Sequence, residues 1–158
     1  MKQTIQEKLI EKNFKPGIIT KDGFLGNDER HIHDIIRADD MTLSRLGLTR
    51  AQIADRLQFF IELGKKAVDN EVVSGDFSVH LQWSRGMLPC PFGEPPLHYK
   101  MIVTVTNNKQ NQMIRYSQLN VHMIREHGFF LGMGSTFRLE PEAIARMLMP
   151  EIENQQST

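Results

Sequence analysis

The chain has 158 residues, of which 40% are hydrophobic and 24% are charged, a composition that is typical of a globular protein and argues against disorder. Its 19 basic residues equal its 19 acidic residues, so it lacks the basic excess that is typical of nucleic-acid-binding proteins. We therefore expect one globular domain over residues 1–158 and no nucleic-acid partner.

The cysteine content and the first residues indicate in which cellular compartment we expect the protein. Cys90 is the single cysteine, so no disulfide can form within the chain, and this favours a reducing compartment. The opening MKQTIQEKLIEKNFKPG contains no apolar block long enough for a signal peptide or a membrane span. We expect a cytoplasmic protein without membrane contact. The zero net charge leaves little repulsion between copies, which allows a homo-oligomer.

The pattern of the first part of the chain is helical. Apolar residues on one face predict a short helix over 3–13, and a glycine-containing loop that could include one short strand follows over 17–30. Asp39 or Asp40 is then expected to cap a short helix that Gly47 ends.

A longer helix is predicted over 49–69. Thr49 and Gln52, three residues apart, form a capping box that marks its start. Its apolar residues recur with helical spacing, so one face should pack against the rest of the protein. These residues are Ile53, Leu57, Phe60, Ile61, Gly64, Ala67 and Val68.

The period then changes to that of strands. Apolar and polar residues alternate over 77–84, which predicts a strand with one buried face. Residues 98–106 and 112–116, joined by the polar turn 107–111, predict a β-hairpin. Between them, 85–97 contains four prolines and two glycines, so we expect irregular structure there.

Helices return at the end of the chain. Ser117 should cap a helix that reaches His127 and stops at Gly128. A glycine-rich connection over 128–138 leads to a final helix over 141–149 that begins with proline.

Helices and strands are therefore segregated along the chain, with helices over about 1–70, strands over about 72–117 and helices over about 118–150. Such segregation predicts an α+β fold rather than alternating α/β units. We expect a small, mainly antiparallel sheet of three to four strands packed on one or more helices.

Two of the six histidines form the first candidate metal site. His31 and His33 would share a face on a strand, and Asp28 and Asp34 could complete or orient a divalent-metal site there. If the segment instead begins a helix, the two side chains point about 200° apart and are solvated. The spacing leaves both interpretations open.

Other histidines offer further combinations. His122 and His127 are five residues apart and point about 140° apart on a helix, so we do not expect them to share an ion. His80 and His98 lie on predicted strands on either side of Cys90, and the three could hold zinc or serve a nucleophilic thiol. Alternatively, Cys90 is a small packed apolar residue between two prolines.

Two loops contain the candidate ligand-binding residues. The proline-rich loop follows an aromatic and a basic residue that could stack on a planar ligand or bind a carboxylate. The glycine-rich connection offers hydroxyls and an arginine, which suit an anion. Alternatively, the aromatic residues of both segments fill the core. The predicted ligand-binding residues are Trp83, Arg85, Phe92, Ser135, Thr136 and Arg138.

These patterns favour a domain that binds a small ligand, an anion or a metal at one end of its sheet, between the 85–97 and 128–138 loops. We also expect that replacing both Arg85 and Arg138 by alanine abolishes anion binding and leaves the fold intact. One alternative is a non-catalytic interaction or assembly module, since apolar residues are abundant in loops. The other is a metal- or thiol-dependent hydrolase that uses His31, His33 and Cys90. The sequence does not decide whether the protein is an enzyme.

Overall fold

A computed structural model describes residues 10–149 of the chain. The helix expected over 3–13 therefore begins outside the described residues, and residues 10–12 are helical. The predicted loop over 17–30 is confirmed, and the short strand that it could include does not form, since the segment contains neither helix nor strand.

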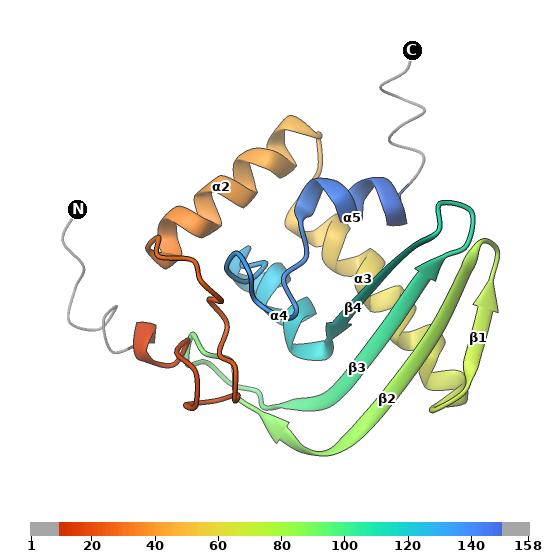
Figure 1. Cartoon of the computed structure of the whole chain (residues 1–158), viewed down its shortest axis with the longest axis horizontal. Helices are drawn as coiled ribbons and strands as arrows, with labels where there is room; N and C mark the ends of the chain where they lie inside the picture. Colours follow the sequence, from red (N-terminus) through yellow and green to blue (C-terminus); the bar gives the residue numbers. More distant parts are fainter. Residues whose placement is uncertain (1–9, 150–158) are drawn as a thin grey trace.

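The centre of the fold is one antiparallel sheet of four strands in the order β1-β2-β3-β4 (Figure 1). The predicted α+β fold is thus confirmed. The strands are β1 (Glu71–Ser74), β2 (Phe77–Leu88), β3 (His98–Asn107) and β4 (Gln112–Ser117). The short edge strand β1 was not predicted as a separate element, because its four residues alternate too briefly to stand out.

Strand β2 is longer than expected, and this corrects the prediction that 85–97 is entirely irregular. A shift in register between Ser84 and Met87 lets β2 continue to Leu88, which pairs with His98. Such a bulge accommodates extra residues without ending the ladder, and the prolines that cannot donate begin only at Pro89.

Helix α2 (Ile32–Arg45) begins seven residues before Asp39, the first of the two predicted caps. The expectation that Asp39 or Asp40 caps a helix is wrong, because both lie within α2. Asp39 is buried there and forms an ion pair with Arg138, a distant partner that local sequence could not reveal.

Helix α3 (Arg50–Gly64) covers one face of the sheet and confirms the predicted capping box of Thr49 and Gln52. A short 3-10 helix, η1 (Lys65–Ala67), follows it. At Gly64 the helix approaches β2 so closely that a Cβ would lie 2.7 Å from the Cβ of Leu81. Glycine at this position therefore permits the close packing of α3 on the sheet.

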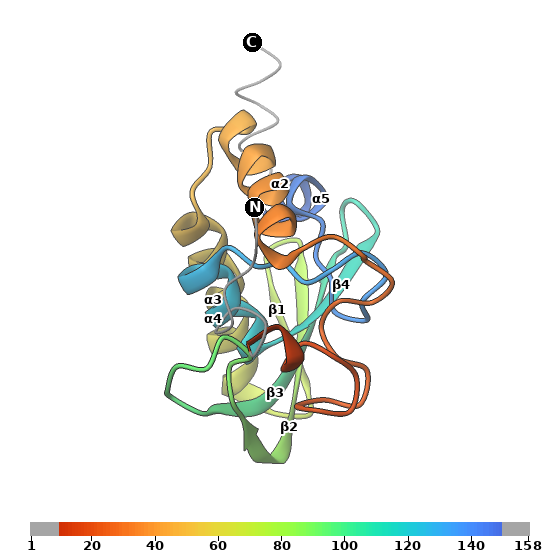
Figure 2. The same cartoon turned by 90° about the vertical axis from the view of Figure 1, so that its left-hand side faces the viewer.

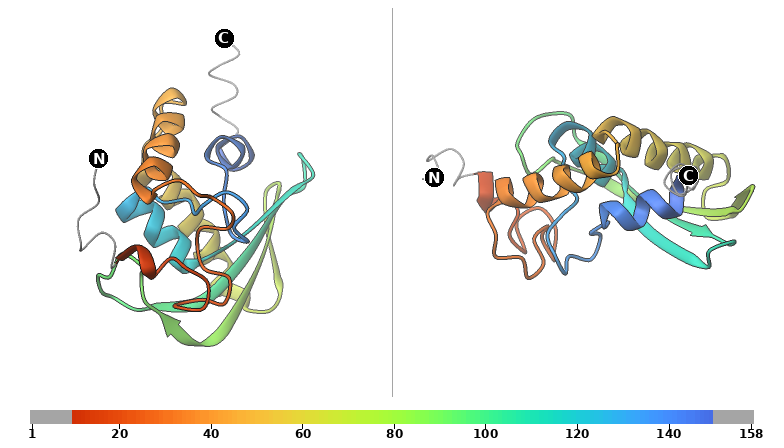
Figure 3. Two further views of the ribbon diagram at one scale, coloured as in Figure 1. Left: turned by 60° about the vertical axis from the view of Figure 1, so that its left-hand side comes forward. Right: turned by 90° about the horizontal axis from the view of Figure 1, so that it is seen from above.

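Helices α4 (Gln118–His127) and α5 (Pro141–Leu148) agree with the predicted segments within one residue. Ser117 caps α4 and Gly128 ends it, as expected. Figure 3 shows α2 and α5 side by side, where Arg45 and Glu142 form an exposed ion pair.

The two faces of the sheet are covered differently. Figure 2 shows α3 and α4 on one side of the sheet and the 17–30 loop on the other. Among the described residues, buried side chains form two clusters, of which the larger joins the sheet to α2, α3, α4 and α5. The smaller cluster lies where the N-terminal segment meets the loop between β2 and β3 and the glycine-rich connection after α4. It comprises Phe14, Phe24, Ile32, Ile35, Cys90, Leu119, Met123, Phe129 and Leu131.

Across residues 10–149, no helix combines the length and the apolar character needed to cross a lipid bilayer.

Candidate metal centre

Four potential metal ligands converge between α4 and the loop that joins β2 to β3. Cys90 and Glu94 come from this loop, and His122 and His127 come from α4. One ligand atom from each side chain lies within 4.8 Å of the others. A tetrahedral zinc site with bonds of about 2.0–2.3 Å separates its ligand atoms by roughly 3.5 Å. Small side-chain adjustments would therefore bring all four atoms onto one ion.

The loop is shaped to present its two ligands together. The Gly93 N–H donates to the Cys90 carbonyl at 2.9 Å, which forms a turn that returns Glu94 to the side of Cys90. The Asn13 side chain donates to the Pro91 carbonyl and ties the loop to the N-terminal segment. The loop is thus anchored at residues flanking the site.

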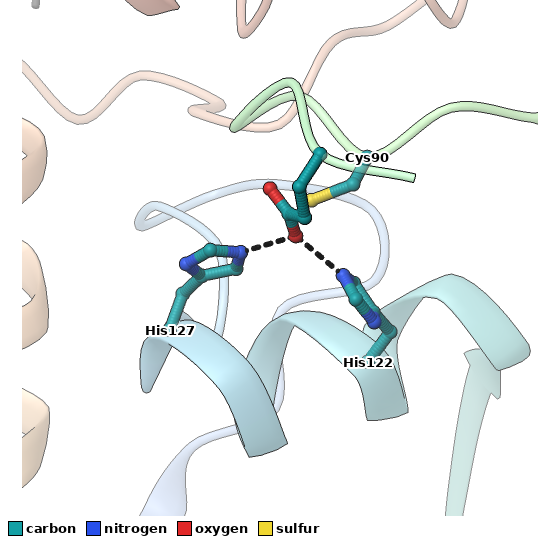
Figure 4. Close-up of side chains that lie close together, drawn as sticks. Cys90, His122 and His127 are labelled. Carbon is teal, nitrogen blue, oxygen red and sulfur yellow. Dashed lines mark hydrogen bonds and ion pairs between the residues drawn. The ribbon is translucent and has the colours of Figure 1, made fainter. Parts of the chain in front are cut away.

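Both histidines contact the same carboxylate oxygen. Nε2 of His122 lies 2.7 Å and Nε2 of His127 lies 2.6 Å from Oε1 of Glu94. Figure 4 shows the two imidazoles directed from α4 toward the loop that carries Cys90, with dashed lines for both interactions. The expectation that their angular separation keeps these histidines apart is wrong. The two side chains extend from successive turns of α4, and Oε1 of Glu94 lies between them, within reach of both Nε2 atoms.

The environment shifts the acid–base properties of both loop residues. Burial alone would raise the pKa of Glu94, but hydrogen bonds from His127, His122 and Cys90 outweigh it and hold that pKa at about 2. For Cys90, burial and then the nearby carboxylate raise the pKa of the thiol to about 12. A thiol with so high a pKa is a poor nucleophile unless a cation displaces its proton.

Two aromatic contacts position the imidazoles. Phe92 stacks on His127 with ring centroids 3.9 Å apart and an interplanar angle of 15°. His98 lies beside His122, with ring centroids 4.3 Å apart. Within the described part of the chain, Nε2 of His98 is the one buried side-chain polar atom without a hydrogen-bond partner. Burial lowers the pKa of His98, with a smaller effect from His122.

The other candidate metal residues lie elsewhere. His31 precedes α2 as its N-cap and His33 lies in the first turn, so the segment is helical and both side chains are exposed. Among residues 10–149, neither belongs to a group of three or more potential metal ligands. His80 lies opposite Glu71 and Thr104 in the sheet, and no group of three or more potential ligands among residues 10–149 joins it to Cys90.

The predicted ligand-binding residues do not form one site. Trp83 is 47% exposed and packs edge-to-face on Tyr99, and Arg85 is exposed on β2. Phe92 instead stacks on His127 of the candidate metal centre. Trp83 and Tyr99 form an exposed aromatic pair that is a candidate surface for self-association. Self-association itself stays a prediction.

The glycine-rich connection divides its predicted residues between two roles. The guanidinium of Arg138 donates to both carboxylate oxygens of Asp39 at 2.9 Å and also to Glu140, so it is held within the protein. Ser135 and Thr136 instead line a cavity against the face of the sheet opposite α3. The expectation that Arg138 can be replaced without cost to the fold therefore conflicts with its buried ion pair.

Glu94 was not identified from the sequence as a potential metal ligand, although one feature of the sequence pointed to it. It is the only acidic residue in the proline-rich 85–97 segment, and it follows Cys90 by four residues. The convergence of this segment with α4 depends on tertiary packing, which spacing alone does not reveal.

No protein-family model, curated protein or solved structure matches this chain.

Proposed function

We propose that this protein binds one divalent transition-metal ion, with a preference for Zn²⁺, through Cys90, Glu94, His122 and His127. The observation that carries the proposal is the convergence of four donor atoms within 4.8 Å from two separate segments. Such a group is more specific than a pair of exposed acidic residues, because it combines a thiol and two imidazoles around one point.

The donor types favour zinc over magnesium or calcium. A thiolate and imidazoles suit Zn²⁺ and neighbouring transition metals, whereas Mg²⁺ and Ca²⁺ prefer oxygen ligands. The single cysteine supports a reducing compartment, in which its thiol stays reduced and can ligate the ion.

Four protein donors favour a closed site whose role is structural or metal-sensing. A hydrolytic zinc site keeps one position open for water, and this cluster supplies enough protein donors to fill a tetrahedron. A thiol-dependent hydrolase is supported less well, because Cys90 is buried and its thiol has a raised pKa.

Metal titration of purified protein tests the proposal. After removal of metal with a chelator, the wild-type protein should bind one equivalent of Zn²⁺, measured by elemental analysis after dialysis. Co²⁺ should give the absorption bands of a tetrahedral thiolate complex. The Cys90→Ser and His122→Ala variants should each lose at least tenfold in affinity, since each removes one ligand.

The double variant His31→Ala/His33→Ala is the matched control, because it removes two exposed histidines outside the cluster. It should bind zinc like the wild type. Wild-type protein that binds neither ion, or a Cys90→Ser variant with unchanged affinity, would show that the cluster is not a metal site.

A further inference from the structure

A cavity of about 300 Å³ lies against the face of the sheet opposite α3. Its floor includes Lys100 and Ile102 of β3, which alternate with the α3-facing residues Met101 and Val103. The 17–30 loop and the glycine-rich connection form its cover, and the first turns of α4 form one wall. Its volume is at the lower end of the range for small-molecule sites.

The two covering segments are held together backbone to backbone. The Gly132 N–H donates to the Phe24 carbonyl at 2.9 Å, and the Asn27 N–H donates to the Met133 carbonyl at 3.0 Å. A Cβ on Gly132 would lie 2.3 Å from the Leu25 carbonyl oxygen, so a side chain there would separate the segments. The glycines of the connection thus permit the close approach that encloses the cavity.

The walls of the cavity are mainly apolar, and they include Phe24, Leu88, Leu119, Met123, Leu131 and Phe137. A few polar groups lie among them. Asn120 is 2% exposed, and its Oδ1 accepts hydrogen bonds from the backbone and hydroxyl of Ser117. Its Nδ2 lies at the cavity lining and donates to no residue that the structure describes, so this amide donor is available to a ligand in the cavity.

A cation accompanies this donor. Lys100 lines the cavity, is partly buried, and makes no hydrogen bond or ion pair within residues 10–149. The other charged lining residues are Lys21 and Asp22, both exposed, so the lining has a net charge of +1 from two lysines and one aspartate. An apolar enclosure with an available amide donor and an unpaired ammonium is complementary to an apolar molecule that carries one carboxylate.

We propose that this cavity binds a small apolar carboxylic acid, with the carboxylate at Lys100 and Asn120 and the hydrocarbon against the apolar walls. The site is separate from the metal cluster. Leu119 and Met123 of α4 line the cavity, whereas His122 and His127 meet Glu94 in the loop between β2 and β3. Binding of the acid therefore stands or falls independently of metal binding.

The probes are 4-phenylbutyrate and its uncharged analogue 4-phenylbutanol, titrated into ¹⁵N-labelled protein and followed by NMR. The acid should bind in the millimolar range or tighter and shift the amide signals of the lining segments. Lys100→Met should weaken acid binding roughly tenfold, the loss expected for one charge-assisted hydrogen bond near solvent. The alcohol should bind more weakly than the acid and bind equally to both proteins.

Lys66→Met is the matched control, because Lys66 is an exposed lysine of η1 and does not line the cavity. It should bind the acid like the wild type. The amide signals of Lys100→Met that lie away from the cavity should match those of the wild type and thereby report an intact fold. Failure of the folded wild type to bind the acid, equal binding of acid and alcohol, or unchanged acid binding by Lys100→Met would each overturn the proposal.

Discussion

Cys90 is the residue at which proton and metal compete most directly. Its thiol has a pKa of about 12, so it is protonated at neutral pH, yet a zinc ligand must be a thiolate. The two imidazole Nε2 atoms that donate to Glu94 must also present lone pairs in order to ligate a metal. Metal binding therefore has to displace at least the proton of Cys90.

This competition predicts a strong pH dependence of zinc affinity. Below the pKa of the metal-free thiol, affinity should rise about tenfold per pH unit for each proton released. Isothermal titration calorimetry in buffers of different ionisation enthalpy should measure at least one proton released per zinc at pH 7. The Cys90→Ser variant should release fewer protons, and equal release by both proteins would contradict the assignment of Cys90 as a ligand.

At the scale of elements, Arg138 joins the glycine-rich connection to α2. Its ion pair with Asp39 is buried, with side chains 6% and 7% exposed, and the guanidinium also donates to the Leu131 carbonyl at 2.6 Å. Hydrogen bonds and the nearby carboxylates of Asp39 and Glu140 raise the pKa of Arg138 despite its burial, so the pair stays ionised. Removing one partner would leave a buried charge without compensation.

We therefore expect Arg138→Met to lower the free energy of unfolding by about 3–5 kcal/mol, measured by urea denaturation. Adding Asp39→Asn to this variant should restore part of the loss, because no buried charge then remains unpaired. Arg45→Ala breaks only the exposed pair between α2 and α5 and should cost less than about 1 kcal/mol. A loss below 1 kcal/mol for Arg138→Met would show that the buried pair does not anchor α2.

The same elements show how far the sequence predicts the fold. The capping box at Thr49, the cap at Ser117 and the alternation in β2 are local signals, and the starts of α3, α4 and β2 were predicted correctly from them. Asp39 was misread as a cap because its partner is 99 residues away. The candidate metal centre could not be predicted from sequence for the same reason, since Cys90 and His122 lie close together only after the loop between β2 and β3 packs on α4.

At the scale of the whole molecule, the proposed metal would connect parts of the fold that are otherwise joined mainly by apolar packing. The loop between β2 and β3 meets α4 at the smaller buried cluster, which contains Cys90, Met123 and Phe129. A metal bound to Cys90 and Glu94 on one side and to two histidines on the other would fix the end of the sheet to α4. Binding to the folded state alone then adds to stability by mass action.

Zinc at a hundredfold excess over its dissociation constant should stabilise the protein by about 2.7 kcal/mol. For a chain of this length, that corresponds to a rise in the thermal midpoint of roughly 5–10 °C, measured by circular dichroism. Cys90→Ser should show less than half of this rise. Arg138→Met should melt lower but gain as much from zinc as the wild type, because its ion pair lies outside the cluster. A zinc-induced rise that is equal in wild type and Cys90→Ser would place the stabilising ion elsewhere.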